Sequence, residues 1–118
     1  MDAMQAKKIA AVFFANASGA EPVRDWLRGL DKADRTKIGE DIRTVEFGWP
    51  IGMPVCRPLG HGLYEVRTTL NNRIARVLFG IEDGEMIVLH GFIKKSQATP
   101  KDDLELARAR LKTFRRYG

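Results

Sequence analysis

The spacing of apolar residues in the first half of the chain predicts one strand followed by two helices. A mainly apolar run over residues 8–14, KIAAVFF, is typical of a strand. Apolar residues then recur every three or four positions over residues 22–30, and Gly29 marks the end of that helix. A second helix is predicted for residues 31–49, with Asp31 as its N-cap. Its apolar face comprises Ile38, Ile42, Val45 and Trp49.

The second half of the chain predicts a succession of strands. Prolines and glycines between residues 50 and 62 exclude a helix there, although residues 55–59 could form a short strand. Three longer strands are predicted, separated by Asn-Asn and Asp-Gly turn signals: residues 63–68, 73–81 and 85–93. Thr99 as N-cap and Pro100 as the first helical residue then open a C-terminal helix with an apolar and a basic face.

The resulting order of elements, β-α-α-β-β-β-β-α, predicts an α+β fold. Consecutive hairpins imply a mainly antiparallel sheet of four or five strands. A two-helix hairpin follows the first strand, and the last helix ends the chain. The 118 residues are expected to form a single domain, residues 1–118.

Composition narrows the class of protein further. A single cysteine, Cys56, excludes an intrachain disulfide and a multi-cysteine metal site, which fits a reducing, cytoplasmic setting. The apolar run at residues 8–14 is too short to span a membrane, so no membrane partner is expected. His61 and His90 lack metal-ligand spacing and the acidic residues are scattered, so we predict neither a metal nor another cofactor.

The positive charge is concentrated in the second half of the chain. The net charge is +5 and the pI about 9.7. Residues 1–59 hold nine Lys/Arg and eight Asp/Glu, giving +1, while residues 60–118 hold eleven and seven, giving +4. A basic half of this kind indicates an anionic partner, most often nucleic acid, although solubility alone is the alternative.

Cations inside the predicted strands are the strongest sign of a functional site, because an unpaired buried charge costs several kcal/mol. Alternation places Glu65 and Arg67 on one face of their strand. In the last strand it places Met86, Val88, His90, Phe92 and Lys94 together, with Lys95 on the other face. Hairpin pairing would gather Arg67, Arg76, His90 and the lysines near the middle and one end of the sheet.

The same residues also have structural explanations. Glu65 could pair with Arg67 or Arg76 across the strands. His90 could be a core histidine with a satisfied hydrogen bond, and Lys94 and Lys95 could form a solvated strand end. No glycine-rich phosphate loop and no Ser-His-Asp arrangement can be read from the sequence.

Four segments, in this order and near this spacing, resemble those of a known protein family: GLYEVR, RIARVLFGI, VLHGFIKKSQATP and ELARAR. The chain thereby resembles the phage-derived, HigB-like branch of the RelE superfamily of bacterial toxins. The resemblance covers residues 60–110 strongly and residues 8–59 in layout. It implies a RelE-like α+β fold and a ribosome-dependent endoribonuclease that cuts mRNA in the decoding site of the 30S subunit. It also implies a cognate antitoxin as partner.

The resemblance implies roles for individual residues. Arg67 corresponds to a basic residue placed against the scissile phosphate, and Arg76 to the arginine of the next strand. Lys94 or Lys95 corresponds to a catalytic basic residue at the end of the last strand, and His90 to a functional histidine. Residues expected to contact RNA are Arg57, His61, Arg73 and Lys101. The alternatives are a non-catalytic nucleic-acid-binding or gyrase-directed member of the same fold, or a regulatory or structural phage protein.

Overall fold

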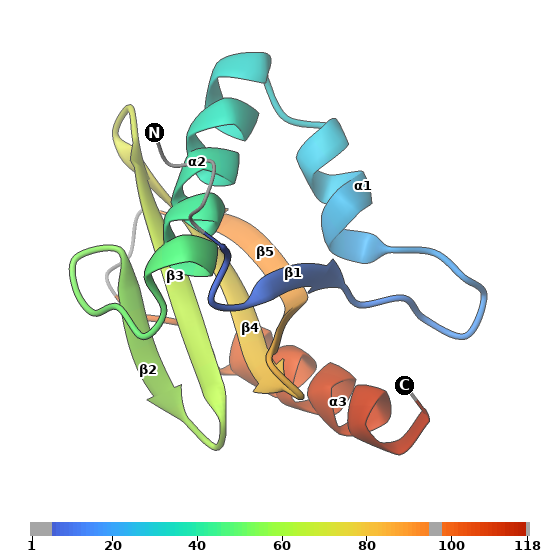
Figure 1. Cartoon of the computed structure of the whole chain (residues 1–118). Coiled ribbons are helices and arrows are strands. Elements are labelled where there is room, and N and C mark those ends of the chain that lie inside the picture. The colour runs from blue at the N-terminus through green and yellow to red at the C-terminus, as the bar shows by residue number, and fades with distance from the viewer. Residues whose placement is uncertain (1–5, 95–97, 118) are drawn as a thin grey trace.

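The computed structural model describes residues 6–94 and 98–117, which form one five-stranded sheet and three helices (Figure 1). The strands are β1 (Ala10–Phe13), β2 (Cys56–Gly60), β3 (Leu63–Leu70), β4 (Arg73–Glu82) and β5 (Glu85–Lys94). The helices are α1 (Pro22–Arg28), α2 (Lys32–Gly48) and α3 (Lys101–Tyr117). The predicted α+β fold and element order are confirmed.

Consecutive strands form antiparallel hairpins, and the first strand joins them at one edge. The strand order is β1-β5-β4-β3-β2, and β2 to β5 pair antiparallel with their neighbours. β1 pairs in parallel with β5, from Ala10 opposite Glu85 to Phe13 opposite Val88. The prediction of a mainly antiparallel sheet is confirmed. The sheet is mixed because the edge strand β1 runs parallel to β5, whereas all other neighbouring strands are antiparallel.

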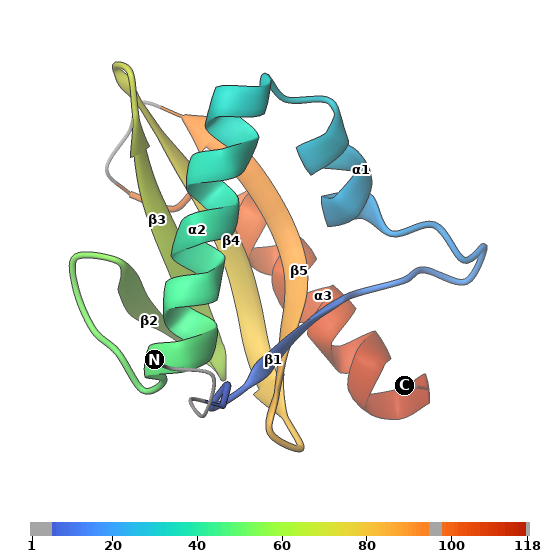
Figure 2. The same cartoon turned by 45° about the horizontal axis from the view of Figure 1, so that its top comes forward.

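The helices cover opposite faces of the sheet (Figures 1 and 2). α1 and α2 cover one face, and the core beneath them includes Val23, Ile38, Val66, Val77, Phe79, Met86 and Val88. α3 covers the other face, and the core beneath it includes Leu63, Leu78, Ile87, Leu89, Phe92, Ala107 and Leu111. None of the helices that the structure describes is long and apolar enough to cross a membrane.

Two strand glycines allow the helices to approach the sheet closely. A Cβ atom on Gly91 would lie 2.4 Å from the ring of Trp26 on α1, and one on Gly80 would lie 2.8 Å from Leu111 on α3. These separations are far below van der Waals contact, so a side chain at either position would push a helix away. The close packing of α3 on the sheet also brings residues at the start of this helix into contact with polar side chains of the strands, described below.

The ends of the elements differ from the predicted ends by a few residues. Asp31 occupies the N-cap position of α2, as predicted, but its side chain makes no capping hydrogen bond. α3 begins at Lys101, and the Pro100 carbonyl accepts a hydrogen bond from the Leu104 N–H. The hydroxyl of Thr99, the predicted N-cap of this helix, donates to Glu65 on β3. Thr99 therefore joins the helix start to the sheet.

A β-bulge interrupts the pairing of β5 with β4. Leu78 pairs with His90, whereas the next residue, Phe79, pairs with Val88. Leu89 is therefore an extra residue between two pairs. An inserted residue reverses the alternation of side chains along the strand.

The bulge divides β5 between the two faces of the sheet. The prediction that Met86, Val88, His90, Phe92 and Lys94 share one face is wrong for this reason. Met86 and Val88 pack beneath α1 and α2, while Phe92 packs beneath α3. His90 and Lys94 also reach α3, through contacts with Asp103. The bulge therefore brings the polar end of β5 to the face that carries Arg67 and Arg76.

Candidate functional site

Three arginines from three adjacent strands gather around one buried glutamate. Arg57 on β2 is the register partner of Glu65 on β3, and Arg67 on β3 is the register partner of Arg76 on β4. Glu65 and Arg67 are two residues apart, so their side chains lie on the same face of the sheet. With Thr99 before α3, these residues form the arginine cluster.

The carboxylate of Glu65 lies at the centre of the arginine cluster. Its Oε2 atom lies 3.1 Å from Nη2 of Arg57 and 3.7 Å from Nε of Arg67. Its Oε1 atom accepts a 2.5 Å hydrogen bond from the Thr99 hydroxyl and lies 3.8 Å from Nη1 of Arg76. The Thr99 oxygen accepts hydrogen bonds from Arg57 at 3.1 Å and from Arg76 at 3.5 Å. One carboxylate and one hydroxyl thus position three guanidinium groups.

Burial separates one inner arginine from two outer ones. The side chains of Arg76 and Glu65 are fully buried, whereas 31% of the Arg57 side chain and 15% of the Arg67 side chain are exposed. Burial lowers the pKa of Arg76, the Glu65 carboxylate opposes this change, and the charges of Arg67 and Arg57 add to it. Arg76 and Glu65 therefore form the buried part of the cluster, while Arg57 and Arg67 are partly exposed to solvent.

The arginine cluster carries more positive than negative charge. Three guanidinium groups against one carboxylate give a net charge of +2. The interpretation that Glu65 pairs with Arg67 or Arg76 is confirmed, and Arg57 is a third partner. Because one carboxylate cannot neutralise three cations, the outer arginines favour a further anion. Their planar forks of N–H donors match the oxygens of a phosphate group.

His90, Lys94 and Asp103 form a second polar group, the histidine cluster, beneath the start of α3. Nε2 of His90 lies 2.6 Å from Oδ1 of Asp103, and Nζ of Lys94 lies 3.2 Å from Oδ2. Burial would raise the pKa of Asp103, but hydrogen bonds from His90 and Lys94, together with their charges, hold it below its ordinary value. Lys94 thus has an acidic partner nine residues further along the chain.

Phe92 lies between the arginine cluster and the histidine cluster. It is the register partner of Arg76, and its ring centroid lies 5.5 Å from that of His90 and 5.5 Å from Nζ of Lys94. His90 and Glu65 both pair with Leu78 of β4, so their Cα atoms are about 10 Å apart at the usual strand spacing. The two clusters are therefore neighbours on one face. Lys95, predicted at the same strand end, lies outside the described residues.

We expect Asp103→Asn to destabilise the protein by about 1–3 kcal/mol at neutral pH, because it weakens charged hydrogen bonds to His90 and Lys94. The folded-state pKa of Asp103 is lowered, so its contribution is present above its unfolded pKa of about 3.9 and is lost as the pH falls through the folded pKa. The difference in free energy of unfolding between the variant and the wild type should therefore shrink below about pH 4. Urea denaturation at several pH values measures this. Asp102→Asn, on the exposed side of the same turn, is the control, and an equal effect of both variants would contradict the assignment.

Residues 25–112 match the family model described as Phage derived protein Gp49-like (DUF891). The chain belongs to this family. The Gp49-like family is related to RelE-type toxins. The matched range includes all residues of the arginine cluster and the histidine cluster. A comparison with curated proteins finds no match.

The residues predicted to contact RNA do not form one site in this Gp49-like protein. Arg57 belongs to the arginine cluster. Arg73 lies on the other face of the sheet, where its Nη2 is 2.9 Å from Oδ2 of Asp34 at the start of α2. Lys101 and His61 line a cavity along α3. Arg73 is therefore separated from the arginine cluster by the sheet. Lys101 and His61 lie on the same face of the sheet as that cluster.

The remaining reactive groups of the Gp49-like protein lie outside these clusters or are inaccessible. Within the described residues, no group of three or more His, Cys, Asp or Glu side chains could hold a metal ion. Cys56 is buried, and burial, followed by the charge of Glu65, raises the pKa of its thiol to about 11. A thiol with so high a pKa is a poor nucleophile at neutral pH. The arginine and histidine clusters are therefore the candidate reactive groups considered below.

Proposed function

We propose that this Gp49-like protein is the toxin of a type II toxin–antitoxin pair and belongs to the HigB-like branch. It acts as a ribosome-dependent, metal-independent endoribonuclease that cuts mRNA in the 30S decoding site. The observation that carries the proposal is the arginine cluster, a preorganised group of guanidiniums with excess positive charge. The histidine cluster beside it supplies a group that can exchange a proton. A cytoplasmic location and a cognate antitoxin are part of the same proposal.

The proposed reaction needs only these side chains, solvent water and the RNA. The 2′-hydroxyl of a nucleotide attacks the adjacent phosphorus, and the bond from phosphorus to the 5′-oxygen breaks. The products are a 2′,3′-cyclic phosphate and a 5′-hydroxyl. Arg67 and Arg57 donate hydrogen bonds to the nonbridging oxygens, where negative charge increases in the transition state. Glu65 and Arg76 hold those guanidiniums in place, so little reorganisation accompanies the reaction.

The histidine cluster handles the proton in this proposal. His90 either takes the proton of the attacking 2′-hydroxyl or gives a proton to the leaving 5′-oxygen, and a solvent water makes the other transfer. Asp103 holds one ring nitrogen of His90 and so orients the ring. Lys94 adds positive charge at the same end of β5 and favours the approach of a phosphate. Lys95, which lies outside the described residues, is proposed to add to this charge.

Regulated expression tests the proposed function. We expect induction to stop growth and co-expression of the small protein encoded beside it to restore growth. Arg67→Ala, expressed to the same level, should be harmless because it removes one of the two guanidiniums proposed to contact the phosphate. Normal growth with abundant wild-type protein would refute the toxin assignment. Growth arrest with DNA damage and intact mRNA would instead identify a gyrase-directed toxin.

A further inference from the structure

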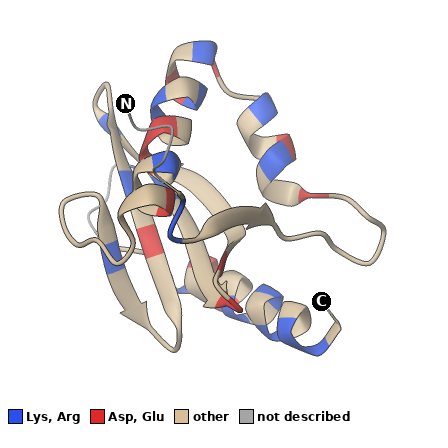
Figure 3. Ribbon diagram, in the orientation of Figure 1, with Lys and Arg blue, Asp and Glu red and all other residues tan. Residues whose placement is uncertain are grey.

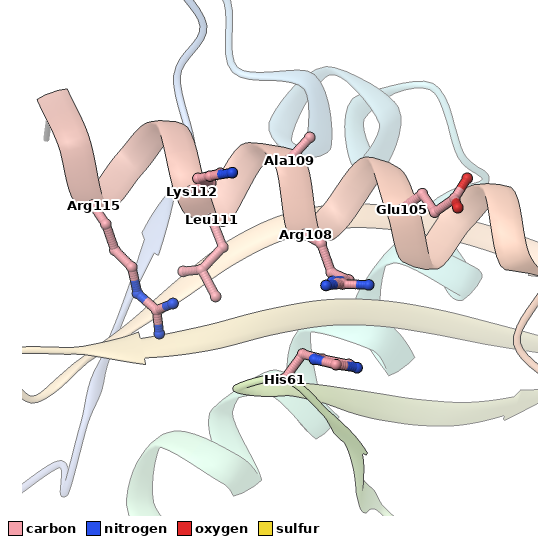
Figure 4. A pocket seen from close by; sticks show the side chains of 7 residues that line it. All are labelled: His61, Glu105, Arg108, Ala109, Leu111, Lys112 and Arg115. Atoms are coloured by element: carbon pink, nitrogen blue, oxygen red, sulfur yellow. The ribbon is translucent and has the colours of Figure 1, made fainter.

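A basic groove lies between α3 and the turn that joins β2 to β3 (Figure 4). Its volume is about 510 Å³, and its charged lining consists of His61, Glu105, Arg108, Lys112 and Arg115. Arg108 and Arg115 extend from the helix toward the turn that carries His61. Figure 3 shows basic segments along much of α3. We call this feature the α3 groove, and the proposed catalytic clusters use none of these residues.

The turn beneath the α3 groove holds His61 in an unfavourable backbone conformation. Gly60, His61 and Gly62 have φ angles of +87°, +56° and +79°. A residue with a Cβ atom is disfavoured in this region relative to the right-handed conformation. Gly62 also lies close to α3, since a Cβ atom there would be 3.2 Å from Nη2 of Arg115. Asn72 and Asp83, in the other two hairpin turns, have the same conformation, so it sets the shape of the turn, and the charges around the groove carry the argument for its role.

The positive charge of the α3 groove is only partly neutralised. Arg115 pairs with Glu82, and Glu105 lies 4.0 Å from Lys101. Neither Arg108 nor Lys112 forms an ion pair within the part of the chain that the structure describes. Both side chains are exposed on α3. The groove therefore offers two cations and an imidazole to an anion from solution.

The α3 groove continues toward the arginine cluster. A neighbouring cavity of about 290 Å³ shares His61, Glu105 and Arg108 with it and extends to Lys101 at the start of the helix. Lys101, Arg108 and Arg115 are seven residues apart in turn, so they lie along one side of α3 at intervals of about 10 Å. Thr99 of the arginine cluster is two residues before Lys101. The row of cations thus leads from the groove to the proposed cleavage site.

We propose that the α3 groove binds the phosphodiester backbone of a single-stranded RNA segment that continues into the arginine cluster. This inference rests on the proposed function, because it treats that cluster as the place where the same strand is cut. Cations spaced along a helix contact phosphates without reading base identity. The groove therefore contributes affinity that is independent of sequence and positions the strand. An acidic protein segment is the competing occupant.

Binding of an RNA that cannot be cleaved tests the inference separately from catalysis. The probe is a fluorescent single-stranded oligonucleotide of about 12 nucleotides, within the usual length of such sites, with 2′-O-methyl groups throughout. Binding to the full chain without ribosomes is measured by anisotropy between about 50 and 200 mM salt. The variant is Arg108→Ala with Lys112→Ala. The control is Lys32→Ala with Arg43→Ala, which removes the same charge from exposed positions on α2, across the sheet.

We expect the groove variant to bind the probe about 10-fold more weakly at low salt. The slope of log affinity against log salt should become shallower by about 1.4, because each of the two lost phosphate contacts contributes ~0.7. The control should keep nearly the wild-type slope. Equal affinity of wild type and groove variant would overturn the inference, as would a wild type that does not bind the probe. Unchanged RNA binding with lost antitoxin binding would assign the groove to the acidic protein. Because the probe has no free 2′-hydroxyl, none of these results depends on nuclease activity.

Discussion

Replacing Glu65 with glutamine is expected to lower the free energy of unfolding by about 3–5 kcal/mol. The substitution preserves shape and one acceptor oxygen but removes the only negative charge of the arginine cluster. Three guanidiniums would then remain close together, with Arg76 fully buried. Breaking a buried ion pair on one side leaves an uncompensated charge, which is far more costly than losing an exposed pair. Urea denaturation of purified protein measures the effect.

Glu85→Gln is the matched control for Glu65→Gln. Glu85 is exposed at the start of β5, so its replacement should change stability by no more than about 0.5 kcal/mol. A loss below about 1 kcal/mol for Glu65→Gln, near that of an ordinary surface change, would show that the carboxylate does not organise the cluster. The cluster would then have to be described as three independent arginines.

Arg67→Ala is expected to slow single-turnover cleavage of ribosome-bound mRNA by about 100–1000-fold. This is the usual consequence of removing one preorganised donor from a developing oxyanion. The protein should remain folded, because Glu65 keeps Arg57, Arg76 and Thr99 as partners. Rate and thermal melting temperature are therefore measured on the same preparation.

Arg43→Ala provides the control for charge alone, since Arg43 is exposed on α2. A rate within a few-fold of wild type is expected for it. If Arg67→Ala also cleaved at the wild-type rate, the outer arginine would be a structural partner of Glu65 and nothing more. If the variant melted well below the wild type, the lost rate would reflect folding, and Arg67→Lys would be needed to separate charge from geometry.

Much of the arginine cluster could be predicted from the sequence because β3 and β4 are regular. Strict alternation in these strands places Glu65 and Arg67 on one face, and hairpin pairing brings Arg76 opposite Arg67. The place of Arg57 in the cluster does not follow from the sequence, because the prolines and glycines around β2 obscure its pairing with Glu65. Arg76 is fully buried beside Glu65, so in the proposed reaction it would position Glu65 and would not contact the phosphate.

The histidine cluster could not be predicted, for two physical reasons. One extra residue at Leu89 reverses the faces of His90 and Lys94, and an insertion of this size leaves no compositional signal. Asp103 meets both side chains only because α3 packs closely over the sheet, a contact that strand patterns cannot show. One signal could have pointed to it: an acidic residue in the first helical turn, soon after a strand end with two lysines.

The most direct test of the central claim is the chemistry of the cut RNA. Purified protein is added to ribosomes stalled on an mRNA, the 5′ ends are mapped, and the reaction is repeated on an mRNA with one 2′-deoxy nucleotide at the mapped site. We expect a 5′-hydroxyl end, a 2′,3′-cyclic phosphate on the upstream fragment, and no cleavage at the deoxy position. Cleavage that persists at the deoxy position, or intact mRNA on ribosomes that have bound the protein, would contradict that claim.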